Sequence, residues 1–310
     1  MIEDRPVVTI TTLGATASGR TTGLLGAYAT LSAPEGDFRV VAAEAAVDEA
    51  LCLGWRSLVG SGRLPADDAV PGSLELHLLA GTVPVLGIDR VDHQVLPDDA
   101  DPLSAGPEGL SDGLSERLVA SDSVHVVLDG RFLVDAVTGG TRRSILRHSG
   151  LARLVPVLAD AWSERAARRL PRPSVVVQVT KSDLIPPWRR PTVDPLVQDV
   201  RMLLEVCFDE GLDTAVCPGS VGRLGLQPGS RVDPEVLRPR GLHLPMLYAL
   251  AHFVEQWSGP PTALPAGLRD AAGCRPGTRP ADRPHSRTPR AWFADLDQVP
   301  RFRDGVPLPP

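Results

Sequence analysis

The sequence predicts an α/β fold: a mostly parallel β-sheet with helices on both faces and one antiparallel hairpin at an edge. Three observations favour it. Apolar runs alternate with helical patterns between residues 7 and 257, which is typical of parallel sheets with crossover helices. Several runs are apolar throughout, as in central strands buried on both faces. Two successive runs are separated only by Ala80-Gly81-Thr82, which is too short for a crossover and predicts a hairpin.

Each expected element is placed by its hydrophobic period. The expected strands are 7–13, 38–42, 74–79, 83–88, 124–128, 175–180 and 214–217. The expected helices are 20–31, 45–59, 113–120, 144–169, 193–210 and 245–257.

Residues 1–258 are expected to form one domain, followed by a tail, residues 259–310. The tail is rich in Pro, Arg and Gly and contains too few apolar residues to fold alone, so disorder is expected. Its removal should then leave the domain folded. The apolar stretch 291–300, which includes Trp292 and Phe293, is either a short docking segment or chance. Residues 89–113 are expected to form a mobile loop.

Charge and composition exclude several function classes. The formal net charge is −6, which argues against a general nucleic-acid or membrane-surface binder. No apolar run approaches the roughly 20 residues that span a bilayer, and the first residues do not resemble a signal peptide. The four cysteines form no CxxC pair, so reduced, mostly buried thiols are expected. A cytoplasmic protein without nucleic-acid or membrane partners is therefore expected.

A glycine-rich segment follows the first strand and precedes a helix. Residues 14–21, Gly-Ala-Thr-Ala-Ser-Gly-Arg-Thr, fit the phosphate-loop pattern G-x-x-x-x-G-K followed by Ser or Thr, with Arg20 in place of Lys. Backbone N–H groups and the helix N-terminus bind phosphate in such loops, and the hydroxyl of Thr21 would bind magnesium. A plain strand–turn–helix corner is the alternative. The candidate phosphate-binding residues are Gly14, Ala17, Ser18, Gly19, Arg20, Thr21 and Thr22.

A second motif, Thr180-Lys181-Ser182-Asp183, ends an apolar strand and fits the guanine-recognition pattern Asn/Thr-Lys-x-Asp. Its carboxylate accepts hydrogen bonds from N1–H and the exocyclic amine of guanine, a pair that adenine does not offer. The Thr can tie this loop to the phosphate loop; a solvated turn is the alternative. After the next strand, Ser220-Val221 stands at the place where guanine-recognition sites have a Ser-Ala dipeptide, whose backbone N–H contacts the guanine oxygen. The candidate guanine-binding residues are Thr180, Lys181, Asp183, Ser220 and Val221.

This ordered set resembles the bacterial double-GTPase proteins of the translation-factor-related (TRAFAC) class of P-loop GTPases. Further matches are LVGSGRLPADD at the place of the first switch, HVVLDGRFL, VVVQVTKSDL and RGLHLPMLYAL. The resemblance covers roughly residues 5–257. It implies a P-loop GTPase-like fold, GTP or GDP with Mg²⁺ as cofactors, and a partner GTPase or effector protein in a bacterial conflict or signalling system.

Departures from a working GTPase fall on the γ-phosphate side. The second switch, D-x-x-G, is matched to Asp89-Arg90-Val91-Asp92, so Asp89 is a candidate magnesium ligand and Asp92 replaces the glycine. His93 stands where many GTPases have a Gln or His that orients the attacking water, so it is the catalytic candidate. The alternative is that His93 is an exposed loop residue. Residues 65–69 lack the first-switch Thr. With Arg20, these changes predict base recognition with weak or absent hydrolysis.

Three functions fit these patterns. The first is a degenerate GTPase-like, guanine-nucleotide-binding regulator, and the second is a pseudo-GTPase scaffold that binds no nucleotide. The third is a full GTPase in which Arg20 replaces Lys; an ATP-dependent kinase is disfavoured because the motif at 180–183 has no role in one. Arg142, Arg143 and Arg147 form a basic cluster, either a solvated face, a partner contact or an arginine finger. Asp129 is expected to cap a loop.

Overall fold

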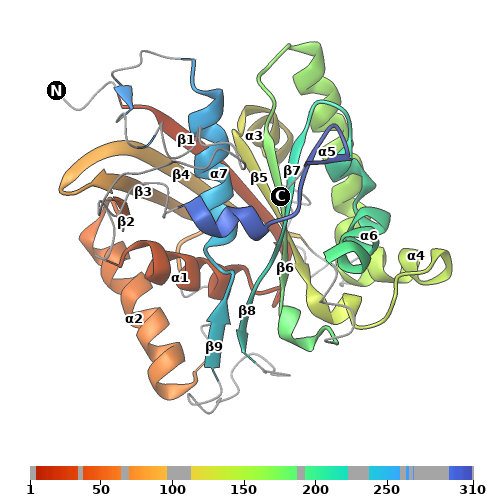
Figure 1. Ribbon diagram of the computed structural model, residues 1–310, viewed down its shortest axis with the longest axis horizontal. Coiled ribbons are helices and arrows are strands. Elements are labelled where there is room, and N and C mark those ends of the chain that lie inside the picture. The colour runs from red at the N-terminus through yellow and green to blue at the C-terminus, as the bar shows by residue number, and fades with distance from the viewer. Residues whose placement is uncertain are drawn as a thin grey trace, which may run out of the picture.

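A computed structural model of the chain describes residues 5–33, 38–63, 70–95, 113–186, 193–222, 237–258, 263–264, 268 and 293–308. A nine-stranded sheet, in the order β11-β10-β7-β6-β5-β1-β4-β3-β2, forms its centre (Figure 1). Its strands are β1 (Val7–Ala15), β2 (Phe38–Ala42), β3 (Ser73–Ala80), β4 (Val83–Val95), β5 (Ser123–Asp129), β6 (Ser174–Thr180), β7 (Asp213–Pro218), β10 (Arg301–Arg303) and β11 (Val306–Pro307).

Helices cover both faces of the sheet and bury two apolar cores. The first core lies under α1 (Arg20–Leu31), α2 (Ala45–Ser61) and α7 (Leu244–Gln256). The second core lies under α3 (Leu114–Ala120), α5 (Leu151–Ala167) and α6 (Val193–Leu203). Helix α4 (Gly139–His148) has no buried residue and lies at the periphery (Figure 1). None of the helices in the described ranges is long and apolar enough to cross a bilayer.

The strand pairing confirms the predicted fold class. Strands β4, β1, β5, β6 and β7 are parallel, while β3 pairs antiparallel with β4 as the expected hairpin and β2 extends that edge. Every residue of β5 and β6 is buried. This explains why their sequences are mostly apolar and do not alternate between a buried apolar face and an exposed polar face. The arrangement is an α/β, P-loop GTPase-like fold, because a glycine-rich loop joins its central strand β1 to α1.

Some element boundaries differ from the prediction. Strand β4 continues to Val95, because residues 89–95 pair with Thr9–Ala15 of β1; cross-strand pairing outweighs their polar composition. The single helix expected at 144–169 is two helices, separated at Gly150, whose φ of 73° is left-handed. The helix expected at 193–210 ends at Leu203 and is followed by a 3₁₀ turn, η4 (Glu205–Phe208).

The prediction of a disordered tail is wrong for residues 293–308. These residues form a 3₁₀ turn, η7 (Ala294–Gln298), and strands β10 and β11, and β10 pairs antiparallel with β7. Phe293, Leu296 and Val299 are buried in the first core, as are Leu264 and Leu268 from the preceding segment. The amino-acid composition of the tail does not predict this contact, because the strand with which the tail pairs, β7, belongs to the domain. Trp292 lies outside the described residues.

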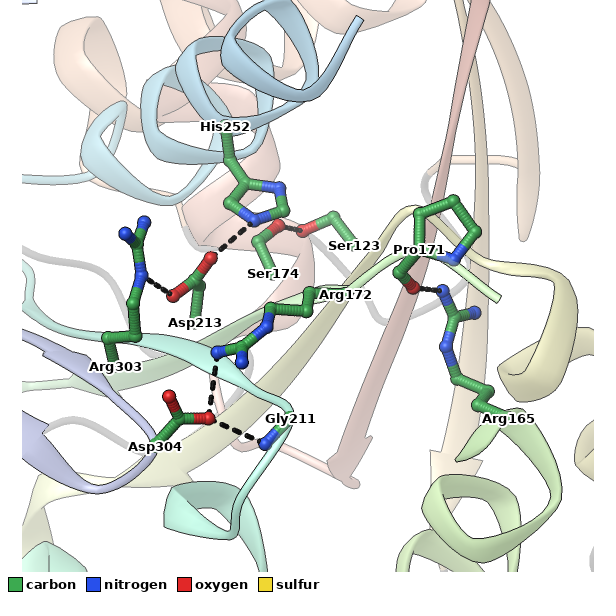
Figure 2. A network of polar contacts seen from close by, with 10 residues as sticks. All are labelled: Ser123, Arg165, Pro171, Arg172, Ser174, Gly211, Asp213, His252, Arg303 and Asp304. Atoms are coloured by element: carbon green, nitrogen blue, oxygen red, sulfur yellow. Dashed lines mark hydrogen bonds and ion pairs between the residues drawn. The ribbon is translucent and has the colours of Figure 1, made fainter. Parts of the chain in front are cut away.

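Polar contacts, drawn in Figure 2, and aromatic contacts hold this C-terminal segment on the domain. Buried Asp213 of β7 bonds Nε2 of His252 at 3.2 Å and accepts a hydrogen bond from Nε of Arg303 at 2.8 Å. The carboxylate of Asp304 accepts from Arg172 and from the backbone N–H of Gly211, both at 2.7 Å.

The aromatic part of this contact is the ring of Phe302, which lies edge-on to Phe208 with centroids 5.1 Å apart. The guanidinium of Arg201 is 5.4 Å and 5.6 Å from the centroids of the Phe208 and Phe302 rings. Edge-on rings and a cation over an aromatic face both stabilise such a contact beyond the buried area alone.

Replacing Phe302, which is 4% exposed, tests the docked segment. We expect Phe302→Ala to lower the free energy of unfolding by about 3 kcal/mol, the cost of emptying a buried phenyl site, as measured by urea denaturation. Val306→Ala is the matched control, because Val306 is 62% exposed, and should change stability by less than about 0.5 kcal/mol. An unchanged midpoint for Phe302→Ala would contradict the docking.

The ion pairs of Asp213 predict a pH dependence. Burial acts to raise the pKa of Asp213, but hydrogen bonds from His252 and Arg303 outweigh it and lower the pKa below its ordinary value. A lowered folded-state pKa stabilises the fold above the unfolded value of about 3.9, and this contribution is lost as pH falls through the folded pKa. Asp213→Asn should therefore cost about 2 kcal/mol near pH 7, and the difference from wild type should shrink below about pH 4. Exposed Asp297, changed to Asn, should show no such difference.

Candidate functional site

The glycine-rich loop lies at the carboxyl end of β1 and leads into α1. Ala17 and Gly19 have left-handed φ angles of 58° and 95°, which turn the chain from the strand into the helix. The N–H of Ser18 donates to the carbonyl of Ala15 at 3.1 Å, and the first helical bond joins Gly23 N–H to the Gly19 carbonyl at 2.8 Å. The N–H groups of the first turn of α1 have no partner within the helix, so the loop presents donors suited to an anion.

The side chain of Arg20 folds back over the loop. A Cβ at Gly14 would lie 3.0 Å from Cδ of Arg20 and 2.8 Å from Oγ of Ser18, so only glycine allows this close approach. The hydroxyl of Ser18 is buried and has no hydrogen-bond partner among the residues that the structure describes. A lysine at this position could follow the same path over the loop. The planar guanidinium of Arg20 is bulkier than the ammonium of a lysine.

The Thr180-Lys181 pair joins this loop to the end of β6. Thr180 Oγ1 donates to the carbonyl of Ser18 at 2.5 Å, and Lys181 Nζ donates to the carbonyl of Ala17 at 2.7 Å. Lys181 also forms an ion pair of 2.5 Å with buried Asp129 at the end of β5. The tie between Thr180 and the phosphate-loop candidate is the contact that the sequence predicts.

Asp129 has the loop-capping role expected of it. Its Oδ1 accepts from the backbone N–H of Arg131 at 2.9 Å and begins the 3₁₀ turn η1 (Gly130–Leu133). The sequence analysis missed its second role, as the counter-ion of Lys181. A signal was present: Asp129 follows the strand beside the motif strand, and parallel strand ends meet at one edge of a sheet.

Four segments distant in the sequence line one pocket at this edge. They are the start of α1, the end of β6 with the loop after it, the turn after β7 with the short strand β8 (Ser220–Gly222), and the segment before α7. Strand β8 pairs with β9 (Leu237–Arg240). The lining residues are Gly19, Thr22, Gly23, Thr180, Lys181, Asp183, Gly219, Ser220, Val221, Gly222 and Leu242.

The structure therefore brings together all five candidate guanine-binding residues with Gly19 and Thr22 of the loop. Backbone hydrogen bonds hold the two base-side loops against each other: Ser182 N–H donates to Gly219 O at 3.1 Å, and Gly219 N–H donates to Val179 O at 2.8 Å. The sequence analysis missed four lining residues, Gly23, Gly219, Gly222 and Leu242. Leu242 lies against Gly26 of α1, so it reaches the wall only through packing between segments distant in the sequence.

The structure does not bring Asp89 to the loop. It pairs with Thr9 in the register of β4 and β1, six residues before Ala15, or about 20 Å along the strand at ~3.3 Å per residue. Its carboxylate accepts from Arg117 of α3 at 2.9 Å. The assignment of Asp89 as a magnesium ligand is thus not supported, because the matched D-x-x-G segment lies inside β4 rather than in a switch loop.

His93 and Asp92 are also strand residues. His93 lies opposite Leu13 and is only partly exposed, and its Nε2 is buried with no hydrogen-bond partner within the described ranges. The pKa of His93 is lowered, chiefly by burial and also by the positive charges of Arg117 and Arg20. The negative charge of Asp92 acts to raise it. Asp92 pairs with Arg90 at 2.9 Å, so its charge is directed to a neighbour in the sheet. The prediction that Asp89–His93 forms a switch loop is wrong, and the mismatch at Asp92 no longer argues against hydrolysis.

Metal binding was tested on the described residues. No group of three or more His, Cys, Asp or Glu side chains among them could hold a metal ion. Of the two predicted ligands, Thr21 lies at the second position of α1 beside the loop. The first-switch stretch, residues 65–69, lies outside the described residues.

Comparisons with known proteins find distant likeness only. No protein-family model matches the sequence, and no curated protein matches it. A GTP-binding protein from Sulfolobus solfataricus in complex with GDP matches with a TM-score of 0.31 and 16% identity, over 69% of this chain and 46% of that chain. An SsGBP and GDP complex matches with a TM-score of 0.30 and 15% identity, over 71% and 45%. This chain thus spans about half of their length, and likeness at this level carries no functional conclusion.

Gly130 offers a test of the link between the strand ends. A Cβ there would lie 2.5 Å from the carbonyl oxygen of Thr180 and 3.0 Å from that of Lys181, so Gly130→Ala should displace the motif loop. We expect it to lower the free energy of unfolding by about 1–3 kcal/mol, as measured by chemical denaturation. Gly140→Ala is the control, because a Cβ there meets only Thr138 Oγ1 at 3.8 Å; it should raise stability by up to about 1 kcal/mol. Equal effects would contradict the packing.

Proposed function

We propose that this protein binds a guanine nucleotide, with the base in the pocket beside Asp183 and the phosphates on the loop 14–21. One observation carries the proposal: residues predicted from three separate motifs lie around one pocket at the carboxyl edge of the sheet. In open α/β sheets, ligands bind outside the carboxyl ends of the strands.

Base selection would rest on Asp183. It follows Lys181, whose left-handed φ of 49° and bonds to Ala17 and Asp129 fix the start of the turn η2 (Ser182–Leu184). A carboxylate at the pocket wall can accept from both N1–H and the amine of guanine. Adenine presents an acceptor at N1, so the same carboxylate would repel it. The backbone of Ser220 and Val221, held on the opposite wall by β8, would contact the guanine oxygen.

We further propose that hydrolysis is weak or absent. The support is Arg20, which stands where a lysine reaches the β- and γ-phosphates, and the absence of a threonine from residues 65–69 of the sequence. A protein that holds nucleotide without rapid turnover suits regulation. The proposed partner is a second GTPase or an effector protein in a bacterial conflict or signalling system. If magnesium is bound, Thr21 and the nucleotide phosphates would hold it.

Two alternatives make different predictions. A nucleotide-free scaffold would use the same fold but show no affinity for GDP. A full GTPase would turn over GTP without a partner, with the guanidinium of Arg20 on the phosphates. Titration with GDP, GTP and ADP, followed by a hydrolysis assay, separates these cases.

Asp183→Asn tests base recognition. It removes the carboxylate that would accept two guanine N–H groups, so GDP binding should weaken by about 2–4 kcal/mol, while binding of xanthosine diphosphate should strengthen. Isothermal titration of both nucleotides measures the change. Ser182→Ala in the same turn is the control and should leave the preference for GDP intact. Equal affinity of the parent protein for ADP and GDP would contradict the assignment of Asp183.

Arg20 tests the phosphate side separately. Arg20→Ala should weaken GDP binding about tenfold or more, since one charge-assisted contact contributes about 1.5–3 kcal/mol, whereas Arg20→Lys should preserve or improve it. Turnover of GTP by the parent protein should not exceed about 10⁻⁴ per second, the scale of unassisted GTPases, and Arg20→Lys alone should not restore it. Brisk hydrolysis by the parent would favour the full GTPase, and no binding by any of the three proteins would favour the scaffold.

A further inference from the structure

Helix α4 carries three arginines, Arg142, Arg143 and Arg147. They form no ion pair and no side-chain hydrogen bond with any residue of the described ranges. The Nε of Arg142 is buried and has no hydrogen-bond partner in that part of the chain. By contrast, buried Arg165 donates to the carbonyl of Ser121, and Arg303 donates to Asp213. The three on α4 are therefore available to an external anion.

The three arginines surround a hollow with an apolar floor. The hollow has a volume of about 440 Å³ and is lined by Arg142, Arg143, Leu146, Arg147, Ala152 and Val155. The apolar floor is formed by Leu146 of α4 and Val155 of α5, which are partly buried against the second core. Positive groups at the rim and apolar groups at the base suit a ligand that carries both carboxylates and an apolar side chain.

Several residues of α4 are unfavourable for the stability of the helix. The helix begins with Gly139 and Gly140, although a Cβ would meet nothing within 4 Å at the first and only a distant Oγ1 at the second. Each glycine in a helix costs about 0.5–1 kcal/mol relative to alanine. The first turn has no acidic residue, and Arg143 and Arg147 are like charges at i and i+4, which is unfavourable. Local choices that oppose the fold are typical of functional surfaces.

We propose that this hollow binds an acidic peptide segment of a partner protein, with glutamate or aspartate carboxylates on the arginines and an apolar side chain on Leu146 and Val155. Arginine pairs with carboxylates through two parallel N–H···O bonds, which gives both affinity and orientation. A protein segment is favoured over a nucleic acid for two reasons. The chain has a net charge of −6, which repels a long polyanion, and a phosphodiester backbone leaves the apolar floor uncovered. The surface does not depend on nucleotide binding.

The experiment uses the full chain and a fluorescent peptide of glutamates interspersed with leucines, followed by fluorescence anisotropy. We expect saturable binding that weakens with salt, and a peptide of glutamates alone should bind more weakly. Arg143→Glu/Arg147→Glu should weaken binding by at least about tenfold, since each opposed charge is unfavourable at an interface. Arg143→Gln/Arg147→Gln, which keeps the side chains long and removes only the charge, should lie between this variant and the parent.

The matched control is Arg56→Glu/Arg169→Glu, which makes the same change in net charge at exposed positions in α2 and in the turn after α5, and it should leave binding unchanged. Circular dichroism checks that all variants are folded. Equal weakening by both glutamate pairs would show a non-specific charge effect and overturn the proposal. Tighter binding of single-stranded oligothymidylate than of the peptide would also overturn it, in favour of a phosphate-binding surface. Failure of the parent to bind the leucine-containing peptide would do the same.

Discussion

The hydrogen bonds from Thr180 and Lys181 to the carbonyls of Ser18 and Ala17 join the two halves of the candidate site. The loop belongs to β1 and the motif to β6, with β5 between them in the sheet. Asp129 closes the gap, since it ends β5 and neutralises Lys181. Lys181 is partly exposed and Asp129 is buried, and a buried carboxylate without such a partner would be costly. The ends of three neighbouring strands thus hold each other in place, and the pocket forms where they meet.

The opposite wall of the pocket depends on the edge of the sheet. Gly219 and Ser220 follow β7 directly, and β7 lies between β6 and the C-terminal strand β10. The N–H of Val216 donates to the carbonyl of Pro300 at 3.0 Å, so the C-terminal segment pairs with β7 close to the turn that leads into this wall. A segment that resembles a disordered tail in composition therefore supports the strand from which one wall of the site extends.

The γ-phosphate side contrasts with this well-supported base side. Asp89, Asp92 and His93, which the sequence assigned to that side, are instead held in β4 by pairing with β1, and Asp89 and Asp92 also form ion pairs with Arg117 and Arg90. Helix α4, which follows the turn capped by Asp129, displays arginines that no described residue neutralises. The molecule thus combines an ordered pocket at the strand ends with a charged surface on a peripheral helix, as suits a protein that communicates with a partner.

The sequence by itself determined the order of most elements and seven of the eleven residues that line the pocket. Hydrophobic runs place β2 and α1 at the predicted bounds, and the motif at 180–183 lies where its pattern predicts, because such signals are local. Only the tertiary structure decided that β4 runs past Asp89 and that residues 301–303 form a strand. Both depend on hydrogen bonds offered by strands distant in the chain. A polar or proline-rich stretch becomes a strand when a partner edge is available, and no local pattern records that edge.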